Sequence, residues 1–452
     1  MQRLMALKIE LWAVLLLLLL AVVGALGFGF AAVDGERGAK RFGKLSETAL
    51  FLAEMPDTVK AALKAKDRMQ VYDSGVFDGK PTGWAPVSGM MPALPGYLLQ
   101  SRYDGTLHRP VVELLSLSDW QVRHEWVIEA DALIGDFKTD SYHAQFSNWE
   151  SEFYRAIHPY LTASGELLVK DHTGPLISVN ACGKRNWIMP GKLFHHSTEA
   201  DAAGNLWIPS VIEPSTIPRT DKTFYEDEIA QVSPEGKLLF ARSVPAMLMK
   251  HGFTHLLFTN ARYSFDPTHL NDIEPVLADG PYWNKGDVFL SLRNISAIVL
   301  YRPSTDQIVW MKQGPWIAQH DVDILNDHMI AVYDNRAEDR GGGRAFVEDH
   351  SRIAAYDFAT GQDGAILDDL MASEKVQTIA AGLYTAMPGG YHLIEDVTQA
   401  TLLLADPAGH KAAEFTNRAE NGKVYQLGWS RFLSQAEGDR ALAAIEGVTC
   451  NE

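Results

Sequence analysis

The stretch AIVLYRPSTDQIVWM, residues 297–311, shows the pattern that decides the fold. It contains an apolar run, a turn made of Pro, Ser, Thr and Asp, and a second apolar run. Two short runs rich in β-branched and aromatic residues, joined by such a turn, are typical of a β-hairpin. A further short strand, GDVFLSL (286–292), precedes it and is entered through glycine. We therefore predict consecutive antiparallel strands in this part of the chain.

The same unit occurs six times along the chain. The other five are VVELLSLSDWQVRHEWV from Val111, LISVNACGKRNWIM from Leu176, IAQVSPEGKLLFAR from Ile229, RIAAYDFATGQDGAIL from Arg352 and TLLLADPAGHKAAEF from Thr401. The six units start 65, 53, 68, 55 and 49 residues apart. A period of about 50 residues with several strands per unit is typical of a β-propeller. We predict an all-β, six-bladed β-propeller over residues 67–452, with the segment near Gly422 as a candidate for the strand that closes the ring.

The chain before the repeats has a different composition. Residues 11–32 are 22 apolar residues without a charge, which is long enough to cross a bilayer core. We expect a transmembrane anchor rather than a signal peptide, because the run is long and Gly29-Phe30-Ala31 is a weak cleavage site. Basic residues stand on both sides of the run, at positions 3 and 8 and at 37, 40, 41 and 44, so the positive-inside rule does not orient it. A lone N-terminal anchor before a large domain predicts that the domain lies outside the cytoplasm, in the periplasm.

Residues 35–66 read as a helical stalk of two short amphipathic helices divided near Pro56. The chain carries 57 Asp and Glu against 40 Lys and Arg, and this acidic balance argues against a nucleic-acid partner. The two cysteines, Cys182 and Cys450, are compatible with a disulfide or with two free thiols. Nothing in the sequence indicates the oligomeric state.

Histidines recur at one position of the repeat. In four successive units the segment expected to form the innermost strand contains histidine, in IHPYLTASG, HHSTEADAAG, THLNDIEPV and QHDVDILND. Innermost strands of neighbouring blades meet at the propeller axis, so these residues are predicted to converge. The histidines are His158, His195 with His196, His269 and His320. Arg293 follows the next strand of its unit, and Asp334 and Asn335 take the matching place one blade later.

At these residues the chain resembles the bacterial arylsulfate sulfotransferase (arylsulfotransferase) family. The resemblance is carried by the His195-His196 pair ahead of a GN strand, by DPTHLND, by GDVFLSLRN, by QHD, and by Asp334-Asn335 with Ser351-Arg352. It covers residues 165–357 well. The resemblance implies a six-bladed propeller that moves a sulfuryl group between phenols through a transiently sulfated histidine, with no nucleotide donor and no cofactor. The partners it implies are a small aryl sulfate and a phenol.

Carried over by motif, the resemblance implies that His320 is the nucleophile. His196, His269 and Arg293 would then surround the transferring group, and His195, Asn271, Asn294, Asp334, Asn335 and His158 are weaker candidates for substrate binding. The sequence departs from the family at Pro267, where an aromatic residue is common, and at Asn294, where histidine is frequent. The small disulfide loop of better-known members has no counterpart. These departures leave the donor and the acceptor open.

These residue types suit sulfuryl transfer without a metal. A neutral imidazole is nucleophilic near pH 7, and a guanidinium stabilises charge on sulfuryl oxygens. Two other classes of function remain. Histidines with Asp272, Asp321 or Asp334 nearby are a possible transition-metal ligand set, although the Arg293 cation argues against it. A membrane-anchored propeller could instead serve as a non-catalytic binding module.

Overall fold

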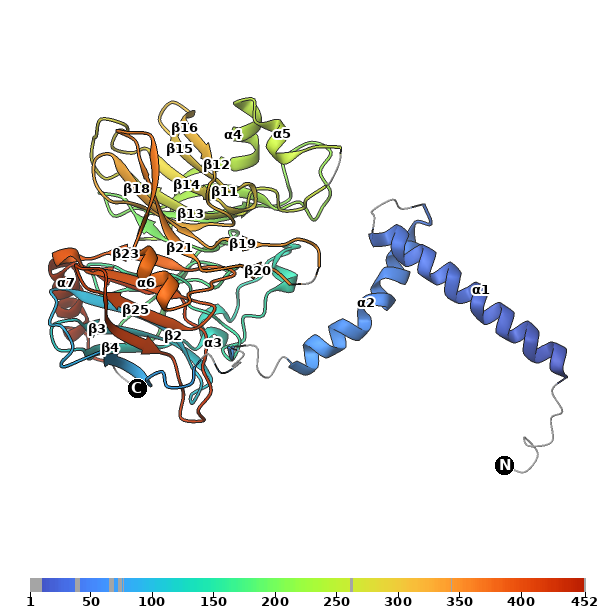
Figure 1. Cartoon of the computed structure of the whole chain (residues 1–452), viewed down its shortest axis with the longest axis horizontal. Helices are drawn as coiled ribbons and strands as arrows, with labels where there is room; N and C mark the ends of the chain where they lie inside the picture. The colour runs from blue at the N-terminus through green and yellow to red at the C-terminus, as the bar shows by residue number, and fades with distance from the viewer. Residues whose placement is uncertain are drawn as a thin grey trace. The chain divides into compact units, whose positions relative to one another are not determined.

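The computed structural model describes residues 10–36, 41–64, 69–71, 75, 77–260, 263–342 and 344–450. The chain divides into two compact units, Met1–Arg68 and Met69–Glu452. The first unit contains helix α1 (Leu11–Glu36), which includes the predicted segment 11–32, and helix α2 (Lys44–Lys64) (Figure 1). An 18-residue window within Leu11–Gly35 has a mean hydropathy of 2.8, and none of that window is buried. By length and composition, α1 is either a membrane anchor or a signal sequence, and both direct a protein beyond the cytoplasm.

The stalk differs from the sequence expectation, because one helix replaces two. Helix α2 runs through Pro56 to Lys64. Proline removes a single backbone hydrogen bond, and the good helix formers around it allow the helix to continue. The Asp34 carboxylate accepts hydrogen bonds from Ser46 Oγ at 2.7 Å and Arg41 N at 2.8 Å, which joins α1 to the start of α2. Positions 3, 8, 37–40, 65 and 66 of the predicted anchor flanks and stalk lie outside the described residues.

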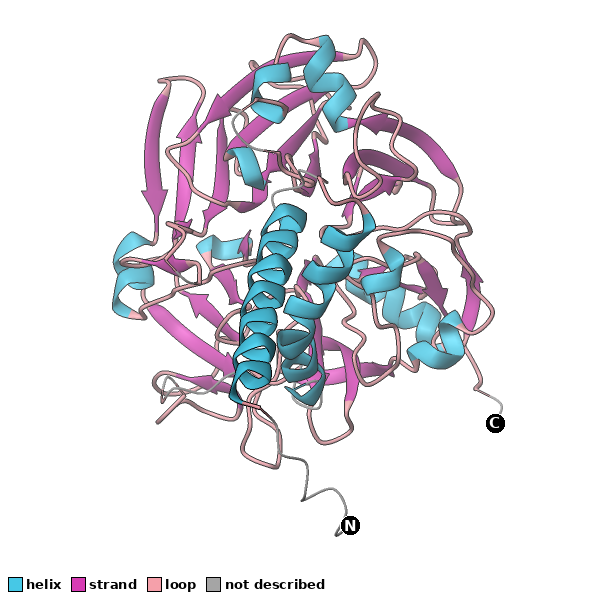
Figure 2. Cartoon of the chain, turned by 90° about the vertical axis from the view of Figure 1, so that its right-hand side faces the viewer, coloured by secondary structure: helices cyan, strands magenta, loops and turns pink. Residues whose placement is uncertain are grey.

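The second unit contains six antiparallel sheets arranged around a common centre, which confirms the predicted six-bladed propeller (Figure 2). The sheets are named blades 1 to 6 in chain order, and the strands of each blade follow from the innermost outward. Blade 1 is β27 (Arg431–Leu433), β2 (Tyr97–Asp104), β3 (Arg109–Ser116) and β4 (Gln121–Val127); blade 2 is β5 (Tyr160–Leu161), β6 (Leu167–Val169), β7 (Ile177–Val179) and β8 (Arg185–Ile188); blade 3 is β9 (Glu199–Ala200), β10 (Leu206–Ile212), β11 (Glu226–Val232) and β12 (Leu238–Ser243). Blade 4 is β13 (Leu270–Pro275), β14 (Val288–Leu292), β15 (Ala297–Arg302) and β16 (Gln307–Gln313); blade 5 is β17 (His320–Ile324), β18 (Met329–Asp334), β21 (Arg352–Asp357) and β22 (Gln362–Ile366); blade 6 is β23 (Leu383–Ala386), β24 (His392–Asp396), β25 (Thr401–Ala405) and β26 (Lys411–Thr416).

Both ends of the second unit take part in closing the ring. Strand β27, which follows the segment near Gly422, is the innermost strand of blade 1 and pairs with β2. Strand β1 (Gly83–Pro86) pairs with β26 as a fifth, outermost strand of blade 6, with Gly83 opposite Thr416. Because strands from both ends complete blades built mainly from other parts of the chain, opening the ring would break two ladders.

Several helices and one small sheet interrupt the strand pattern that the sequence predicts. They are α3 (Ala130–Ile134), α4 (Val244–Lys250), α5 (Thr254–Leu257), α6 (Asp368–Ser373), α7 (Gln435–Glu446), three short 3-10 turns (Ala144–Phe146, Arg293–Ile295, Pro388–Gly390) and the pair β19 (Ala337–Glu338) and β20 (Phe346–Val347). All but α7 lie in connections between strands. Helix α7 begins at a capping box, in which Ser434 and Glu437 satisfy each other's backbone N–H groups.

The hydrophobic core is divided among the spaces between neighbouring blades. Six large clusters of buried side chains occur among the described residues, and each draws mainly on two adjacent blades. The cluster between blades 3 and 4, for example, contains Trp207 and Ile229 from one blade and Leu290 and Val299 from the next. Central strands are apolar on both faces because each blade packs against two others. Val288–Leu292 is buried along its whole length for this reason.

Near the axis, consecutive blades are joined by a repeated hydrogen bond. In blades 2 to 5 a side chain on or just before the innermost strand, and in blade 6 Glu395 on β24, accepts a backbone N–H on or just before the innermost strand of the next blade. The acceptor and donor pairs are His158 Nδ1 with Thr198 N, Ser197 Oγ with Ile273 N, Asp272 Oδ2 with Val322 N, Asp321 Oδ2 with Tyr384 N, and Glu395 with Trp429 N. These bonds explain why polar side chains are buried here, and they hold the residues next to each one in place.

The cysteine question that the sequence leaves open is answered by a disulfide between Cys182 and Cys450, whose Cα atoms lie 5.5 Å apart. Cys182 lies in the β7–β8 turn of blade 2, and Cys450 follows α7. The bond therefore ties the C-terminal segment to blade 2.

Removing this bond is expected to destabilise the propeller. It closes a loop of 268 residues, and closing a loop of that length restricts the unfolded chain by an amount worth about 3–5 kcal/mol. The double variant Cys182→Ser/Cys450→Ser should lose that much free energy of unfolding, measured by urea denaturation. A reducing agent should lower the midpoint of the native protein and leave the double variant unchanged; equal sensitivity of both would contradict the assignment.

Candidate active site

Histidines from three consecutive blades meet near the axis. The ring centroid of His196, just before β9, lies 5.0 Å from that of His269, just before β13, and 6.1 Å from that of His320, the first residue of β17. His196 and His269 have positive φ angles of 53° and 51°, a conformation that residues other than glycine rarely adopt. Such conformations concentrate at functional sites, where the surrounding structure holds them. The sequence expectation that distant histidines converge agrees with this geometry.

His195 and His196 form a pair in which the proton positions follow from their partners. His195 Nε2 lies 3.3 Å from the Ser210 carbonyl oxygen and donates to it. A neutral His195 then has a lone pair on Nδ1, which accepts from His196 Nδ1 at 2.8 Å. The lone pair of His196 is therefore on Nε2. His195 lies behind His196, where it packs against Tyr225 and has no ring contact with His269 or His320.

Asn335 fixes the orientation of His320. The Asn335 amide donates from Nδ2 to the carbonyl oxygens of Thr378 at 2.9 Å and Ala381 at 2.7 Å, so its Oδ1 faces His320 Nδ1 at 2.8 Å. His320 Nδ1 therefore carries the proton, and the lone pair is on Nε2. The Ala381 backbone N–H lies 3.2 Å from Nε2 and makes a long hydrogen bond to it.

His269 is held by a carboxylate and is open to solvent. Its Nδ1 lies 2.5 Å from Asp266 Oδ2, its backbone N–H donates to the same carboxylate, and 26% of its side chain is exposed. Arg293 N donates to the His269 carbonyl, which places the arginine beside this histidine. The Arg293 guanidinium donates to Asn294 Oδ1 at 2.8 Å, and Asn294 Nδ2 donates to the Asp266 carbonyl at 2.7 Å. Asn294 therefore links Arg293 to the His269 loop.

Burial keeps most of these imidazoles neutral. It lowers the pKa of His195, His196 and His320 well below the ordinary value of 6.5, and the nearby Arg293 charge lowers that of His320 further. Burial also lowers the pKa of Arg293, against the attraction of Asp266. The arginine forms no ion pair with any described residue, so its charge is available to an anion.

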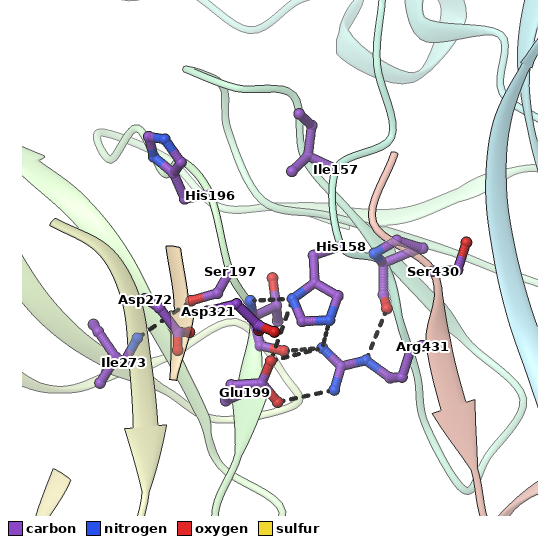
Figure 3. Close-up of polar contacts among 12 residues, drawn as sticks. Ile157, His158, His196, Ser197, Glu199, Asp272, Ile273, Asp321, Ser430 and Arg431 are labelled. Carbon is purple, nitrogen blue, oxygen red and sulfur yellow. Dashed lines mark hydrogen bonds and ion pairs between the residues drawn. The ribbon is translucent and has the colours of Figure 1, made fainter. Parts of the chain in front are cut away.

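The remaining predicted residues lie around the cluster rather than within it. Asn271 is buried and donates from Nδ2 to the Gln319 carbonyl at 2.7 Å, which joins blades 4 and 5. Asp334 accepts from Arg352 Nε at 2.9 Å and from backbone N–H groups. His158 lies apart, with its Nε2 2.8 Å from Arg431 Nη2 (Figure 3). In these positions the three residues are better placed to stabilise the fold than to contact a transferring group.

Three further residues of the site were missed from the sequence. The His172 ring lies 4.3 Å from that of His196, and the side chain is exposed to solvent. Trp429 is buried, with its ring 6.3 Å from His196 and 6.1 Å from His320. Asp266, described above, is the third. His172 follows β6 as Arg293 follows β14, so position in the repeat would have identified it.

A second polar region lies near the axis, next to His158. A cavity of about 100 Å³ is lined by five carboxylates, Glu199, Asp272, Glu274, Asp321 and Asp323, and by one cation, Arg431. Burial and mutual repulsion raise the pKa of Asp272 to about 7 and raise those of Glu274, Asp321 and Asp323. Across the described ranges, no group of three or more His, Cys, Asp or Glu side chains is arranged to hold a metal ion.

The acidic cavity predicts that stability falls as pH rises. Because the folded pKa of Asp272 is raised, its stabilising contribution is complete below the unfolded pKa of about 4 and is lost as pH rises through about 7. Asp272→Asn keeps an acceptor for Val322 N and cannot ionise. At pH 8 the variant should be more stable than the native protein by on the order of 4 kcal/mol at most, and at pH 4 the two should be close. Urea unfolding at both pH values measures this, and an equal difference at both would contradict it.

The fold and these contacts together define a class: a six-bladed β-propeller with a largely buried cluster of histidines near its axis, next to an arginine that forms no ion pair with a described residue. A family model described as Arylsulfotransferase (ASST) matches residues 164–418, more than half of the 452 residues. The chain belongs to the arylsulfotransferase (ASST) family. The matched range runs from blade 2 through blade 6 and includes all the histidines of the cluster, so the resemblance seen in the sequence is confirmed.

Comparison with solved structures finds matches at low sequence identity. A protein of unknown function from Bacteroides caccae is 11% identical with a TM-score of 0.46, over 75% of this chain and 99% of that one. The Dos1 propeller is 10% identical with a TM-score of 0.37, over 74% and 73%. Virginiamycin B lyase from Staphylococcus aureus is 11% identical with a TM-score of 0.34, over 59% and 71%. A search of curated proteins found no match.

Proposed function

We propose that this protein is an aryl-sulfate sulfotransferase that moves a sulfuryl group from an aryl sulfate to a phenol through a covalent intermediate on His320. The observation that carries the proposal is the convergence of three imidazoles and an available arginine within a chain of this family. His320 is the proposed nucleophile because Asn335 holds its proton on Nδ1 and burial keeps it neutral.

In the first half-reaction, the His320 Nε2 lone pair attacks the sulfur of the aryl sulfate. A nitrogen–sulfur bond forms and the sulfur–oxygen bond to the aryl group breaks, which releases a phenolate. Attack through Nε2 requires that the long hydrogen bond from Ala381 N be given up. Arg293 meets the negative charge on the sulfuryl oxygens.

His269 is the proposed proton donor and acceptor. The Asp266 carboxylate holds its Nδ1, and its Nε2 is the proposed donor of a proton to the departing phenolate. In the second half-reaction the acceptor phenol returns a proton to His269 and attacks the sulfur, and the nitrogen–sulfur bond breaks. Free His320 is restored, and the sulfate ester now stands on the acceptor.

The direct test is incubation with 4-nitrophenyl sulfate and phenol, followed by intact mass measurement after a rapid quench. The proposal expects nitrophenolate release that depends on phenol and an adduct of one sulfuryl group on the protein. A binding propeller, the alternative function, predicts neither. Absence of both transfer and adduct with several donors would reject the enzyme proposal.

We further propose that α1 stays in the membrane as an anchor and that the propeller lies in the periplasm. The uncharged span of α1 supports insertion, and the Cys182–Cys450 disulfide suits an oxidising compartment. Alkaline carbonate extraction and protease access to intact spheroplasts test the two parts separately. Release of full-length protein by carbonate would contradict the anchor, and protection of the propeller from protease would contradict its location.

A further inference from the structure

Helix α2 of the N-terminal unit carries an exposed apolar face. Leu45 is 71% exposed, Leu52 45% and Met55 40%. These residues lie seven and three positions apart in the sequence, so they fall on one side of the helix. Phe51, which is 64% exposed, borders the same face, and the exposed Glu47 lies on the opposite side. A group of large exposed apolar side chains of this kind indicates a surface that contacts a membrane or another protein.

A different side of α2 contacts the end of α1. A Cβ at Gly35 would lie 2.7 Å from the Ser46 carbonyl oxygen and 3.1 Å from the Leu50 Cβ, so the glycine permits a close approach of the two helices. The Asp34 carboxylate accepts a hydrogen bond from Ser46 Oγ at 2.7 Å, and both side chains are buried. The start of α2 is therefore fixed to the C-terminal end of α1, and the two helices diverge from this contact (Figure 1).

This contact sets the depth of α2 when α1 crosses a bilayer. The 26 residues of α1 span roughly 39 Å at 1.5 Å per residue, which exceeds the hydrocarbon core of about 30 Å. Asp34 is the first charged residue after the apolar run, so it lies at the level of the lipid headgroups. Its bond to Ser46 brings the neighbouring Leu45 to the same level. Two exposed cations, Arg41 and Lys44, also lie at this end of α2, where they can meet lipid phosphates.

We propose, on the basis of the proposed anchor, that α2 lies in the bilayer interface with Leu45, Leu52 and Met55 turned into the lipid. A helix with one apolar face and one polar face binds a membrane surface in this way. The partner of the exposed face is then a lipid surface, and α2 does not stand in water as a stalk. The membrane attachment consists of two helices, and the spacer that leads to the propeller begins after Lys64 rather than after Glu36.

The test measures the depth of single positions in the full-length protein. Vesicles of phosphatidylethanolamine and phosphatidylglycerol hold the variants Leu45→Cys, Leu52→Cys and Glu47→Cys, each labelled with a nitroxide. The native Cys182 and Cys450 form the disulfide and do not take the label. Electron paramagnetic resonance then gives the collision rates with oxygen, which concentrates in the bilayer, and with a water-soluble nickel complex. The ratio of oxygen to nickel collisions should be several-fold higher at positions 45 and 52 than at position 47 on the polar side.

A label in α1, from Leu16→Cys, separates failure of this inference from failure of the anchor. Nickel access at positions 45 and 52 equal to that at position 47, with position 16 protected, would overturn the inference and leave the anchor standing. Nickel access at all four positions would reject both. Protection of positions 45 and 52 with nickel access at position 16 would reject the anchor and support the surface contact. Spin–spin broadening at positions 45 and 52 that disappears on dilution with unlabelled protein would show that a second copy covers the face, and would overturn the inference.

Discussion

Replacing His320 with asparagine is expected to abolish both sulfuryl transfer and the covalent adduct. The amide has no nucleophilic lone pair equivalent to imidazole Nε2, and losing the nucleophile of a covalent mechanism typically lowers kcat by about 10⁴-fold to 10⁶-fold. The side chain is buried with a polar partner in Asn335, and the shorter amide can keep a hydrogen bond there. The variant should therefore fold. Turnover of 4-nitrophenyl sulfate and intact mass after a rapid quench measure the two effects.

Variants of the neighbouring histidines serve as the contrast. His196→Asn and His269→Asn should slow turnover and still allow some adduct, because these residues assist a group that they do not bond to covalently. His251→Asn, at the end of α4 and outside the cluster, should match the native protein. If His320→Asn still accumulated a sulfated species, the nucleophile would lie elsewhere. His269 would then be the first residue to test, because its Asp266 partner occupies Nδ1 and leaves Nε2 available.

Arg293→Ala is expected to lower kcat by about 10²-fold to 10³-fold, because removal of one preorganised stabiliser of transition-state charge typically has that effect. Arg293→Lys keeps the charge and loses the planar fork, so its activity should fall between those of the alanine variant and the native protein. The guanidinium pairs with no carboxylate of the described residues, and its contact is with the adjacent Asn294. Stability should therefore change little.

The control for Arg293 is an arginine with a purely local partner. Arg123 lies on the outer strand β4 and pairs with Asp119 four residues away, so Arg123→Ala should leave kcat unchanged. The pH profile of kcat gives a second measurement. Arg293 lowers the pKa of the His320 imidazole, so loss of its charge should raise that pKa and shift the acidic limb of the profile to higher pH. Full activity in Arg293→Ala would remove the residue from the mechanism.

Several local features of the fold could be predicted because they depend on neighbours in the sequence. Hairpin turns, strand alternation and the apolar run of residues 11–32 each depend on a few adjacent residues, and six repeats of one hairpin define a propeller. The helix that continues through Pro56 was not predicted, because the cost of one lost hydrogen bond depends on the whole helix. The short helices in the connections, such as α4, also escaped detection, since their stability comes from packing against neighbouring strands.

The sequence by itself determined the repeat, the family and the histidines that occupy equivalent places in successive units. The tertiary structure decided which of those histidines meet, because contacts between blades join residues far apart in the chain. It placed His196 toward His269 and His320 with His195 behind, and it set His158 apart beside Arg431. It also brought His172 and Trp429 to the cluster. The physical reason is that strand patterns record which face of a strand is apolar, whereas the closure of the ring determines which strand ends lie side by side.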